Sequence, residues 1–177
     1  ELFGGNSQLI VQHFMFAPGW GEGCVGCSFG ADHVDGARPH LEHHDVSFVA
    51  VSRATIAEIE AYRRRMGWGF KWVSAHDNDF NYDFNVTFTP AQLAAGPVTY
   101  NYTPTSQAMS DEPGFSVFVK DDNGDIFHTY SSYGRGNEEI IGTYMFLDLT
   151  PNGRNETING NLTDWVRRHD AYDAAPR

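Results

Sequence analysis

The sequence has no long hydrophobic run, few basic residues and only two cysteines. Its longest apolar stretches, such as residues 14–17 and 144–147, are far shorter than the ~20 residues that span a bilayer, so no membrane partner is expected. The 12 Lys and Arg residues against 23 Asp and Glu residues give a net charge of −11, which disfavours binding to nucleic acid. A disulfide between two cysteines three positions apart would enclose a very small loop, so it would stabilise the fold little.

The composition is that of a globular protein rich in loops, with 41% hydrophobic residues and 18 glycines. A chain of 177 residues buries a core without help from a metal or a disulfide, so we expect one domain over residues 1–177. The chain begins at Glu1 and runs almost at once into a strand-like segment, which predicts an N-terminally trimmed form.

Strand and helix signals alternate in the first part of the chain. Three apolar runs have the length and composition of buried strands, namely residues 8–17, 45–52 and 70–75. Residues 24–37 are compatible with a helix that Pro39 ends or kinks. Thr55 and Glu58 have the spacing of a capping box, which predicts a helix that Gly67 closes.

The second part is less regular. Residues 76–110 lose their periodicity over a stretch longer than a usual connection, which predicts an irregular insert. Two apolar runs then flank an Asn-Gly pair at 123–124, the strongest short-range signal for a hairpin. Residues 137–150 and 161–172 predict two terminal helices. This order indicates an α/β fold with a central mixed β-sheet flanked by helices.

Both cysteines belong to one C-x-x-C motif, which follows the first predicted strand and opens a predicted helix. Unpaired N–H groups and the positive end of the helix dipole favour an anion at Cys24, so its thiolate forms near neutral pH. Cys27 lies one helical turn further on, within reach of the same sulfur. We predict that Cys24 attacks and Cys27 resolves. For Glu22 a solvated loop carboxylate is the default, and the alternative is that its like charge raises the pKa of Cys24.

The order of strand, C-x-x-C helix, strand, helix and a proline entering a hairpin resembles the thioredoxin fold. In thioredoxins a cis-proline faces the dithiol just before the hairpin strand, and the resemblance makes Pro113 in EPGFSVF the candidate for that position. The sequence does not determine the isomer of Pro113, since most X-Pro bonds are trans. More narrowly, FMFAPGWGEGCVGCSFGADHVDGARPHL, VAVSRATIAEIEAYRRRMGWGFKWVS and DFNYDFNV resemble an uncharacterised bacterial thioredoxin-like family, a domain of unknown function. The resemblance implies a thioredoxin-like fold with the irregular insert placed before the C-terminal hairpin.

Two departures from known redox families limit what the resemblance implies. Gly23 stands where thioredoxins usually have a tryptophan, and Val25-Gly26 replaces their Gly-Pro. The peroxiredoxin signature P-x-x-x-T/S-x-x-C fails because Pro18 lies six positions before Cys24, which disfavours peroxidase activity.

Metal binding is the main chemical rival of redox chemistry. Besides the two cysteines, nearby histidines offer ligands for zinc, namely His33, His40, His43 and His44. No second ligand pair appears at the spacing of a structural zinc module, so we expect neither a metal nor a cofactor.

Aromatic side chains near the motif and in the insert are candidate walls of a substrate groove, although core packing is the alternative for each. The candidate substrate-binding residues are Trp20, Glu22, Phe80 and Tyr82. The sequence predicts a thiol-disulfide oxidoreductase acting on a protein or small-molecule disulfide. A non-catalytic thioredoxin-fold binding module and a Cys/His metal-binding protein are left open. C-x-x-C chemistry operates in both the cytoplasm and the periplasm, so the sequence does not fix the compartment of the protein, although the cytoplasm is favoured.

Overall fold

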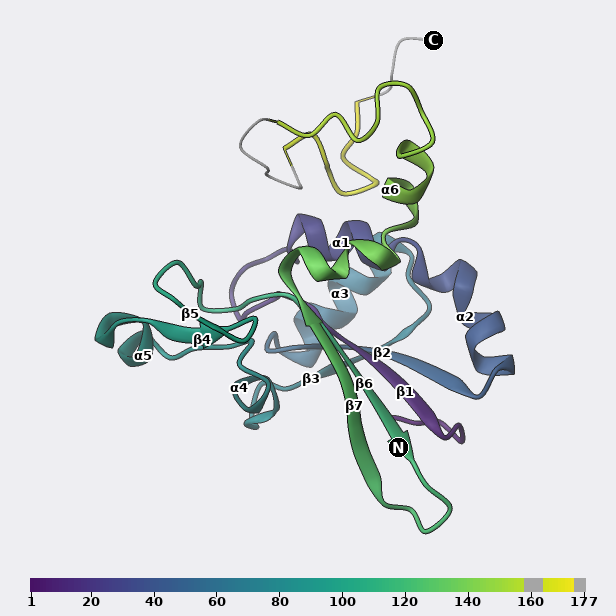
Figure 1. The fold of residues 1–177 in the computed structure, drawn as a ribbon, viewed down its shortest axis with the longest axis vertical. Coiled ribbons are helices and arrows are strands. Elements are labelled where there is room, and N and C mark those ends of the chain that lie inside the picture. The colour runs from purple at the N-terminus through teal and green to yellow at the C-terminus, as the bar shows by residue number, and fades with distance from the viewer. Residues whose placement is uncertain (158–163, 174–177) are drawn as a thin grey trace.

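A five-stranded sheet forms the centre of the computed structural model, which describes residues 1–157 and 164–173 (Figure 1). Its strands, in spatial order, are β3 (Lys71–Ser74), β2 (Val46–Ser52), β1 (Gln8–His13), β6 (Gly114–Lys120) and β7 (Ile126–Tyr133). The first three are parallel to one another, whereas β6 and β7 run antiparallel to their neighbours. The sheet is therefore mixed, as predicted.

Two buried clusters join the helices to this sheet, one with α1 (Val25–Ala31) and α3 (Ile56–Met66) and the other with α4 (Phe80–Asp83). Cys27 and Ala31 of α1 and Ile59, Tyr62 and Met66 of α3 share one buried cluster with aromatic residues of the strands and loops. A second buried cluster on the sheet joins Val11 and Val49 to Phe3 near the N-terminus, with Phe80 of α4 packed against it. A C-x-x-C helix after the central strand, with a parallel strand on one side and an antiparallel hairpin on the other, confirms the thioredoxin-like fold.

Local sequence signals account for several element ends. The Thr55 side chain accepts from the Glu58 backbone N–H and the Glu58 carboxylate accepts from the Thr55 backbone N–H, which is the predicted capping box. Gly67 ends α3 with φ +68°, a conformation that glycine adopts without a steric penalty. Gly124, with φ +89°, lies in the turn between β6 and β7, so the predicted hairpin is confirmed.

The predicted helix over 24–37 is wrong as a single element. It is divided into α1 and α2 (Val34–His43) at Asp32 and His33, and the Asp32 carboxylate at this break accepts from the Trp68 indole N–H at 2.8 Å. Pro39 neither ends nor interrupts α2 but lies inside it.

The two predicted terminal helices also differ from the structure. Residues 137–150 fall in a 3-10 helix, η1 (Gly134–Ile140), and a short helix, α6 (Gly142–Leu147). The chain changes direction at Gly142, where a Cβ would lie 3.0 Å from the His33 ring. Residues 164–172 are not helical, because their side chains make long-range contacts instead, and the start of that predicted helix lies outside the described residues.

The segment 76–110 contains short regular elements. Besides α4 they are α5 (Pro90–Ala95), β4 (Val98–Tyr100) and β5 (Thr103–Thr105), and β4 pairs with β5 in a separate two-stranded sheet. Figure 1 shows this pair projecting to one side of the central sheet. Within the described part of the chain, no helix has the length and apolar character needed to cross a membrane.

Candidate redox site

Cys24 lies at the N-terminal end of α1, in the capping position, with φ −53° and ψ 136°. Its backbone N–H donates to the Met15 carbonyl at 3.0 Å, which ties the start of the helix to the chain leaving β1. Its own carbonyl accepts from the Ser28 backbone N–H at 3.0 Å and from the Ser28 hydroxyl at 2.7 Å. The backbone around the half-buried Cys24 thiol is therefore fixed on both sides.

Hydrogen bonds lower the pKa of the Cys24 thiol to about 6, chiefly one from the Cys27 side chain and then those from the backbone of Cys27 and Gly26. The charge of Arg168 acts in the same direction, whereas burial opposes them. At neutral pH Cys24 is therefore mostly a thiolate, which is the nucleophilic form of cysteine.

Glu22, the acidic residue near Cys24, is engaged in ion pairs. Its carboxylate is paired with Arg65 and, at 3.0 Å, with Arg168, and hydrogen bonding to Arg65 lowers the pKa of Glu22. Because two cations neutralise this carboxylate, it does not raise the pKa of the neighbouring thiol.

Cys27 has the opposite character. It is only 6% exposed, and its Sγ accepts from the Met15 N–H at 3.5 Å. Its hydrogen bond to Cys24, its burial and the charge of the Cys24 thiolate all raise the pKa of Cys27 well above the usual range. Both cysteines are free in this structure, so the pair consists of a thiolate and a buried thiol that donates to it.

A chain of hydrogen bonds supports the first turn of α1 from behind. The Arg168 guanidinium donates to the Tyr62 hydroxyl at 2.9 Å, Tyr62 is 2.9 Å from the Ser28 hydroxyl, and Ser28 donates to the Cys24 carbonyl. Arg168 also donates to the Gly23 carbonyl at 2.6 Å. A Cβ on Gly23 would lie 2.6 Å from the Phe14 ring, so the tight packing explains why no larger residue precedes Cys24.

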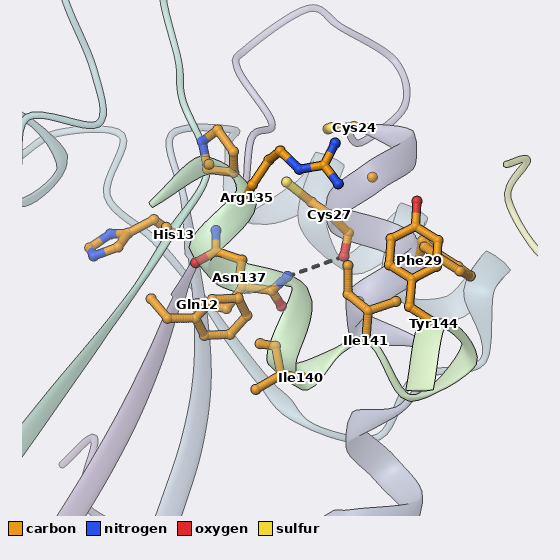
Figure 2. Close-up of a pocket in the computed structure, with 16 residues that line it drawn as sticks. Gln12, His13, Cys24, Cys27, Phe29, Arg135, Asn137, Ile140, Ile141 and Tyr144 are labelled. Atoms are coloured by element: carbon orange, nitrogen blue, oxygen red, sulfur yellow. Dashed lines mark hydrogen bonds between the residues drawn. The ribbon is translucent and has the colours of Figure 1, made fainter. Parts of the chain in front are cut away.

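A pocket of about 330 Å³ opens beside the two sulfurs (Figure 2). The ends of β1 and β6, the first turns of α1, and η1 with α6 form its walls. The lining residues are Gln12, His13, Cys24, Gly26, Cys27, Phe29, Gly30, Pro113, Gly114, Phe115, Gly134, Arg135, Asn137, Ile140, Ile141 and Tyr144. The structure thus brings Cys24, Cys27 and Pro113 together around one cavity.

The other predicted binding residues lie elsewhere. Trp20 is 41% exposed, Tyr82 is half-buried within α4, and Glu22 belongs to the ion pairs described above. Phe80 packs against His13 and Phe84. None of these four lines the pocket.

Pro113 borders the pocket at the start of β6. Throughout the described residues every peptide bond is trans, including the one before Pro113, whose isomer the sequence does not determine and which thus differs from the cis-proline of thioredoxins. The Tyr100 hydroxyl donates to the Pro113 carbonyl at 2.7 Å and accepts from the Gly134 N–H at 2.9 Å. This single side chain from β4 holds β6 and η1 together at the rim of the pocket, which fixes Pro113 without an unusual peptide bond.

A model of the bacterial family of unknown function DUF899 matches residues 1–172. The chain belongs to this family. The uncharacterised bacterial family that the C-x-x-C region resembles is therefore confirmed, and no curated protein matches the DUF899 chain in sequence.

Among solved structures, similarity to the DUF899 chain extends over most of its length at low identity. The Xanthomonas campestris bacterioferritin comigratory protein is 11% identical, with 78% of each chain covered and a TM-score of 0.48. Xylella fastidiosa PrxQ is 14% identical over 80% of this chain and 77% of its own, and Mycobacterium tuberculosis peroxidoxin BcpB is 11% identical over 80% of both, each with a TM-score of 0.48. Similarity at this level assigns no activity to the DUF899 protein.

Sequence reasoning missed Arg168 and the pocket wall formed by η1 and α6. The local pattern around Arg168 indicates only a helix, and its contact with Gly23 spans 145 positions in the chain. Apolar residues at 140 and 141 were visible in sequence, but nothing local indicates that they lie beside the dithiol of a DUF899 protein.

The histidines proposed as metal ligands do not gather around the cysteines. His33 contacts the Thr143 hydroxyl at 2.8 Å, and His40 and His43 lie in the exposed last turn of α2. Across residues 1–157 and 164–173, no group of three or more His, Cys, Asp or Glu side chains is placed to hold a metal ion. The metal-binding alternative gains no support from this geometry.

Proposed function

We propose that this DUF899 protein is a thiol-disulfide oxidoreductase, in which Cys24 attacks a disulfide and Cys27 resolves the resulting mixed disulfide. The observation that supports this proposal is the opposite shift of two adjacent thiols. The pKa of Cys24 is lowered to about 6, whereas that of Cys27 is raised by its hydrogen bond to Cys24 and by burial. One sulfur is thus ready to attack, and the other stays protonated until it is needed.

The chemistry proceeds in two displacements at sulfur. The Cys24 thiolate attacks one sulfur of a substrate R–S–S–R, a bond forms between Cys24 and that sulfur, and R–S⁻ leaves. The released thiolate, or water, takes the proton of Cys27. The Cys27 thiolate then attacks Cys24 Sγ and displaces the second R–S⁻, so the substrate gains two electrons and the protein ends as a Cys24–Cys27 disulfide. An external thiol reductant restores the dithiol.

Pro113 is assigned the role of shaping the substrate side of the site. It lines the same pocket as both cysteines, and the Tyr100 hydroxyl fixes its carbonyl. The four other predicted binding residues are not included in the proposal, because they lie outside this pocket.

Trapping of mixed disulfides tests the assigned roles. A Cys27→Ser variant is expected to accumulate mixed disulfides on Cys24, because the resolving sulfur is gone, whereas a Cys24→Ser variant is expected to form none. Mass spectrometry of each variant after exposure to a disulfide gives the readout. Trapping only in Cys24→Ser would reverse the roles.

A redox titration of the Cys24/Cys27 couple with mass detection separates an active dithiol from an idle one. We expect full and reversible interconversion of dithiol and disulfide. A Cys24 pKa of about 8.5, as in free cysteine, together with no reduction of insulin or of small disulfides, would favour the non-catalytic binding module instead.

A further inference from the structure

We infer that the substrate of this dithiol is a small, uncharged disulfide with short apolar substituents, bound in the pocket beside Cys24. The inference rests on the proposed function and narrows its substrate from disulfides in general to one chemical class. It follows from the size of the pocket, the chemistry of its walls and a glycine that leaves space inside it.

The size of the pocket suits a small molecule. A volume of about 330 Å³ lies at the lower end of the ~300–1,000 Å³ typical of ligand sites. The pocket lies between α1, which carries both cysteines, and the segment formed by η1 and α6 (Figure 2). A disulfide in a folded protein is flanked by main chain on both sides and needs an open groove rather than a cavity between two helical segments.

The walls of the pocket are mainly apolar. Figure 2 shows the side chains of Ile140, Ile141 and Tyr144 on the same cavity as the two cysteines, and Phe29 and Phe115 complete the apolar surface. No Asp or Glu of the described residues lines the pocket. A cationic substituent would therefore lose its hydration here without gaining a carboxylate partner, and the lining Arg135, which an anionic substituent would face, is already paired with Glu138 and Glu156. An alkyl group gains contact with apolar side chains.

Each polar side chain on the walls named below makes at least one contact with the protein, and His13 Nε2 lies 2.7 Å from the Ser116 hydroxyl. The Gln12 amide N–H donates to the Cys27 carbonyl at 3.1 Å, and this bond fixes the amide orientation because a carbonyl only accepts. Two buried atoms of the lining side chains, Gln12 Oε1 and His13 Nδ1, have no hydrogen-bond partner among the described residues. Asn137 accepts from the Ser132 hydroxyl, and Arg135 pairs with Glu138 and Glu156. The pocket therefore selects through its shape and its apolar surface.

Gly30 provides part of the space. It lies inside α1, and a Cβ built on it would be 3.9 Å from Gln12 Nε2 and 3.9 Å from Ile141 Cγ1, which is ordinary van der Waals contact. An alanine therefore fits without strain, and a valine extends further into the cavity. Gly36 of α2 offers a matched control, because it is exposed and a Cβ there would meet nothing within 4 Å.

Three disulfides of nearly equal shape test the preference for apolar substituents. In dipropyl disulfide, bis(2-hydroxyethyl) disulfide and cystamine, the terminal group is methyl, hydroxyl and ammonium, respectively. The reduced protein is mixed with each, the rate of Cys24–Cys27 disulfide formation is measured, and each rate is divided by that of a free thiol such as N-acetylcysteine. We expect the normalised rate with dipropyl disulfide to exceed that with cystamine by at least about tenfold, because burying an unpaired ammonium is costly. The hydroxyl compound is expected to fall between them.

Substitutions at Gly30 locate this preference. Gly30→Val is expected to slow the reaction with dipropyl disulfide about tenfold and the reaction with cystamine little, because each added methyl group occupies space that an alkyl substituent needs. The rates of Gly30→Ala are expected to be intermediate. Gly36→Val is expected to match the wild type. Alkylation of Cys24 by iodoacetamide is expected to change by less than about twofold in all of them, which shows that the thiolate is intact.

The possible failures are distinguishable. Equal normalised rates for the three compounds, a preference for cystamine, or rates that Gly30→Val and Gly30→Ala leave unchanged would overturn the inference. Rapid reduction of insulin that is insensitive to Gly30 would also overturn it while the proposed function stands. If no disulfide reacts although Cys24 is readily alkylated, the proposed function itself fails.

Discussion

Arg168 donates to the carbonyl oxygen of Gly23 at 2.6 Å, although 145 positions separate the two residues in sequence. The contact places a cation immediately behind the residue that precedes Cys24. Through Tyr62 and Ser28 the same guanidinium is also connected to the Cys24 carbonyl. One side chain from the C-terminal segment thus holds the backbone of the first turn of α1 and contributes to the electrostatic environment of its thiolate.

Loss of this cation is expected to raise the pKa of Cys24. Arg168→Met removes a positive charge that lowers this pKa, so the rate of Cys24 alkylation by iodoacetamide below pH 7 should fall several-fold. Arg168→Lys keeps the charge but not the paired hydrogen bonds. Its alkylation rate should therefore lie between those of the wild type and Arg168→Met. The measurement is the alkylation rate as a function of pH.

Arg167 supplies the control for that experiment. It is exposed, and its guanidinium donates to two carbonyls of its own segment, those of Asp164 and Val166. Arg167→Met is therefore expected to leave the titration of Cys24 unchanged. An identical pH profile for Arg168→Met and Arg167→Met would show that Arg168 has a structural role alone.

The hydrogen bond between the two thiols makes a separate prediction. In the wild type the alkylation rate of Cys24 should rise with pH around a midpoint of about 6. The side chain of Cys27 makes the largest contribution to this low pKa, so Cys27→Ala should move the midpoint upward. Cys27→Ser retains an O–H donor and should move it less.

Mass spectrometry of the alkylated protein gives the rate for Cys24 in each variant. The order of midpoints is expected to be wild type, then Cys27→Ser, then Cys27→Ala. If Cys27→Ala keeps a midpoint near 6, the backbone N–H groups of α1 alone stabilise the thiolate, and the pairing of the thiols has no electrostatic role.

Signals that act over a few residues predicted much of the central fold. Continuous apolar runs indicated β1, β2 and β3. The capping box indicated the start of α3, and an Asn-Gly turn indicated the β6–β7 hairpin. The helix start at the C-x-x-C motif was predicted as well, because the strand end and the helix start lie within a few positions of each other. Each of these features depends on neighbours in the chain.

Features that depend on distant residues were not predictable in this way. Residues 164–172 have a helical pattern, yet contacts such as Arg168 with Gly23 determine their course. Likewise, Pro113 was identified from its place before a strand, whereas its trans bond and the Tyr100 hydroxyl that holds it are tertiary features. The pocket wall formed by η1 and α6 belongs to the same class.

A buried ion pair between Arg53, which follows β2, and Asp111, which follows the insert, yields a stability prediction. Asp111 is 2% exposed and accepts from Arg53 at 2.8 Å and 2.7 Å and from the Thr87 hydroxyl at 3.0 Å. Asp111→Ala leaves the partly buried guanidinium unpaired, so the free energy of unfolding should fall by about 3 kcal/mol. Urea denaturation measures this loss.

Asp148 offers a matched comparison, because it also accepts two hydrogen bonds from one arginine, Arg154, at 2.7 Å and 2.8 Å, but lies at the surface. Asp148→Ala should therefore cost much less stability than Asp111→Ala. Equal losses in the two variants would mean that burial of the Arg53–Asp111 pair does not determine its contribution.

Glu112, which lies between Asp111 and the pocket residue Pro113, should make stability fall as the pH rises. Burial raises the pKa of this carboxyl in the folded protein. Below its ordinary pKa the group is protonated in both states, whereas above its folded pKa the folded protein carries a partly buried carboxylate that the unfolded chain keeps hydrated. Glu112→Gln keeps the shape and accepts the same 2.8 Å bond from the Met109 N–H, but has no charge.

Urea denaturation of Glu112→Gln and the wild type across the pH range is therefore expected to give equal stability near pH 4 and a more stable variant at pH 7. Glu139→Gln, at an exposed position of η1, controls for loss of one negative charge from an acidic protein and should show no such divergence. Because the charge of Glu112 also raises the pKa of Cys27, Glu112→Gln should speed the resolving step as well. A variant that is less stable than the wild type at pH 7 would mean that the Glu112 carboxylate has a favourable charged partner in the folded state, which contradicts the dominance of burial.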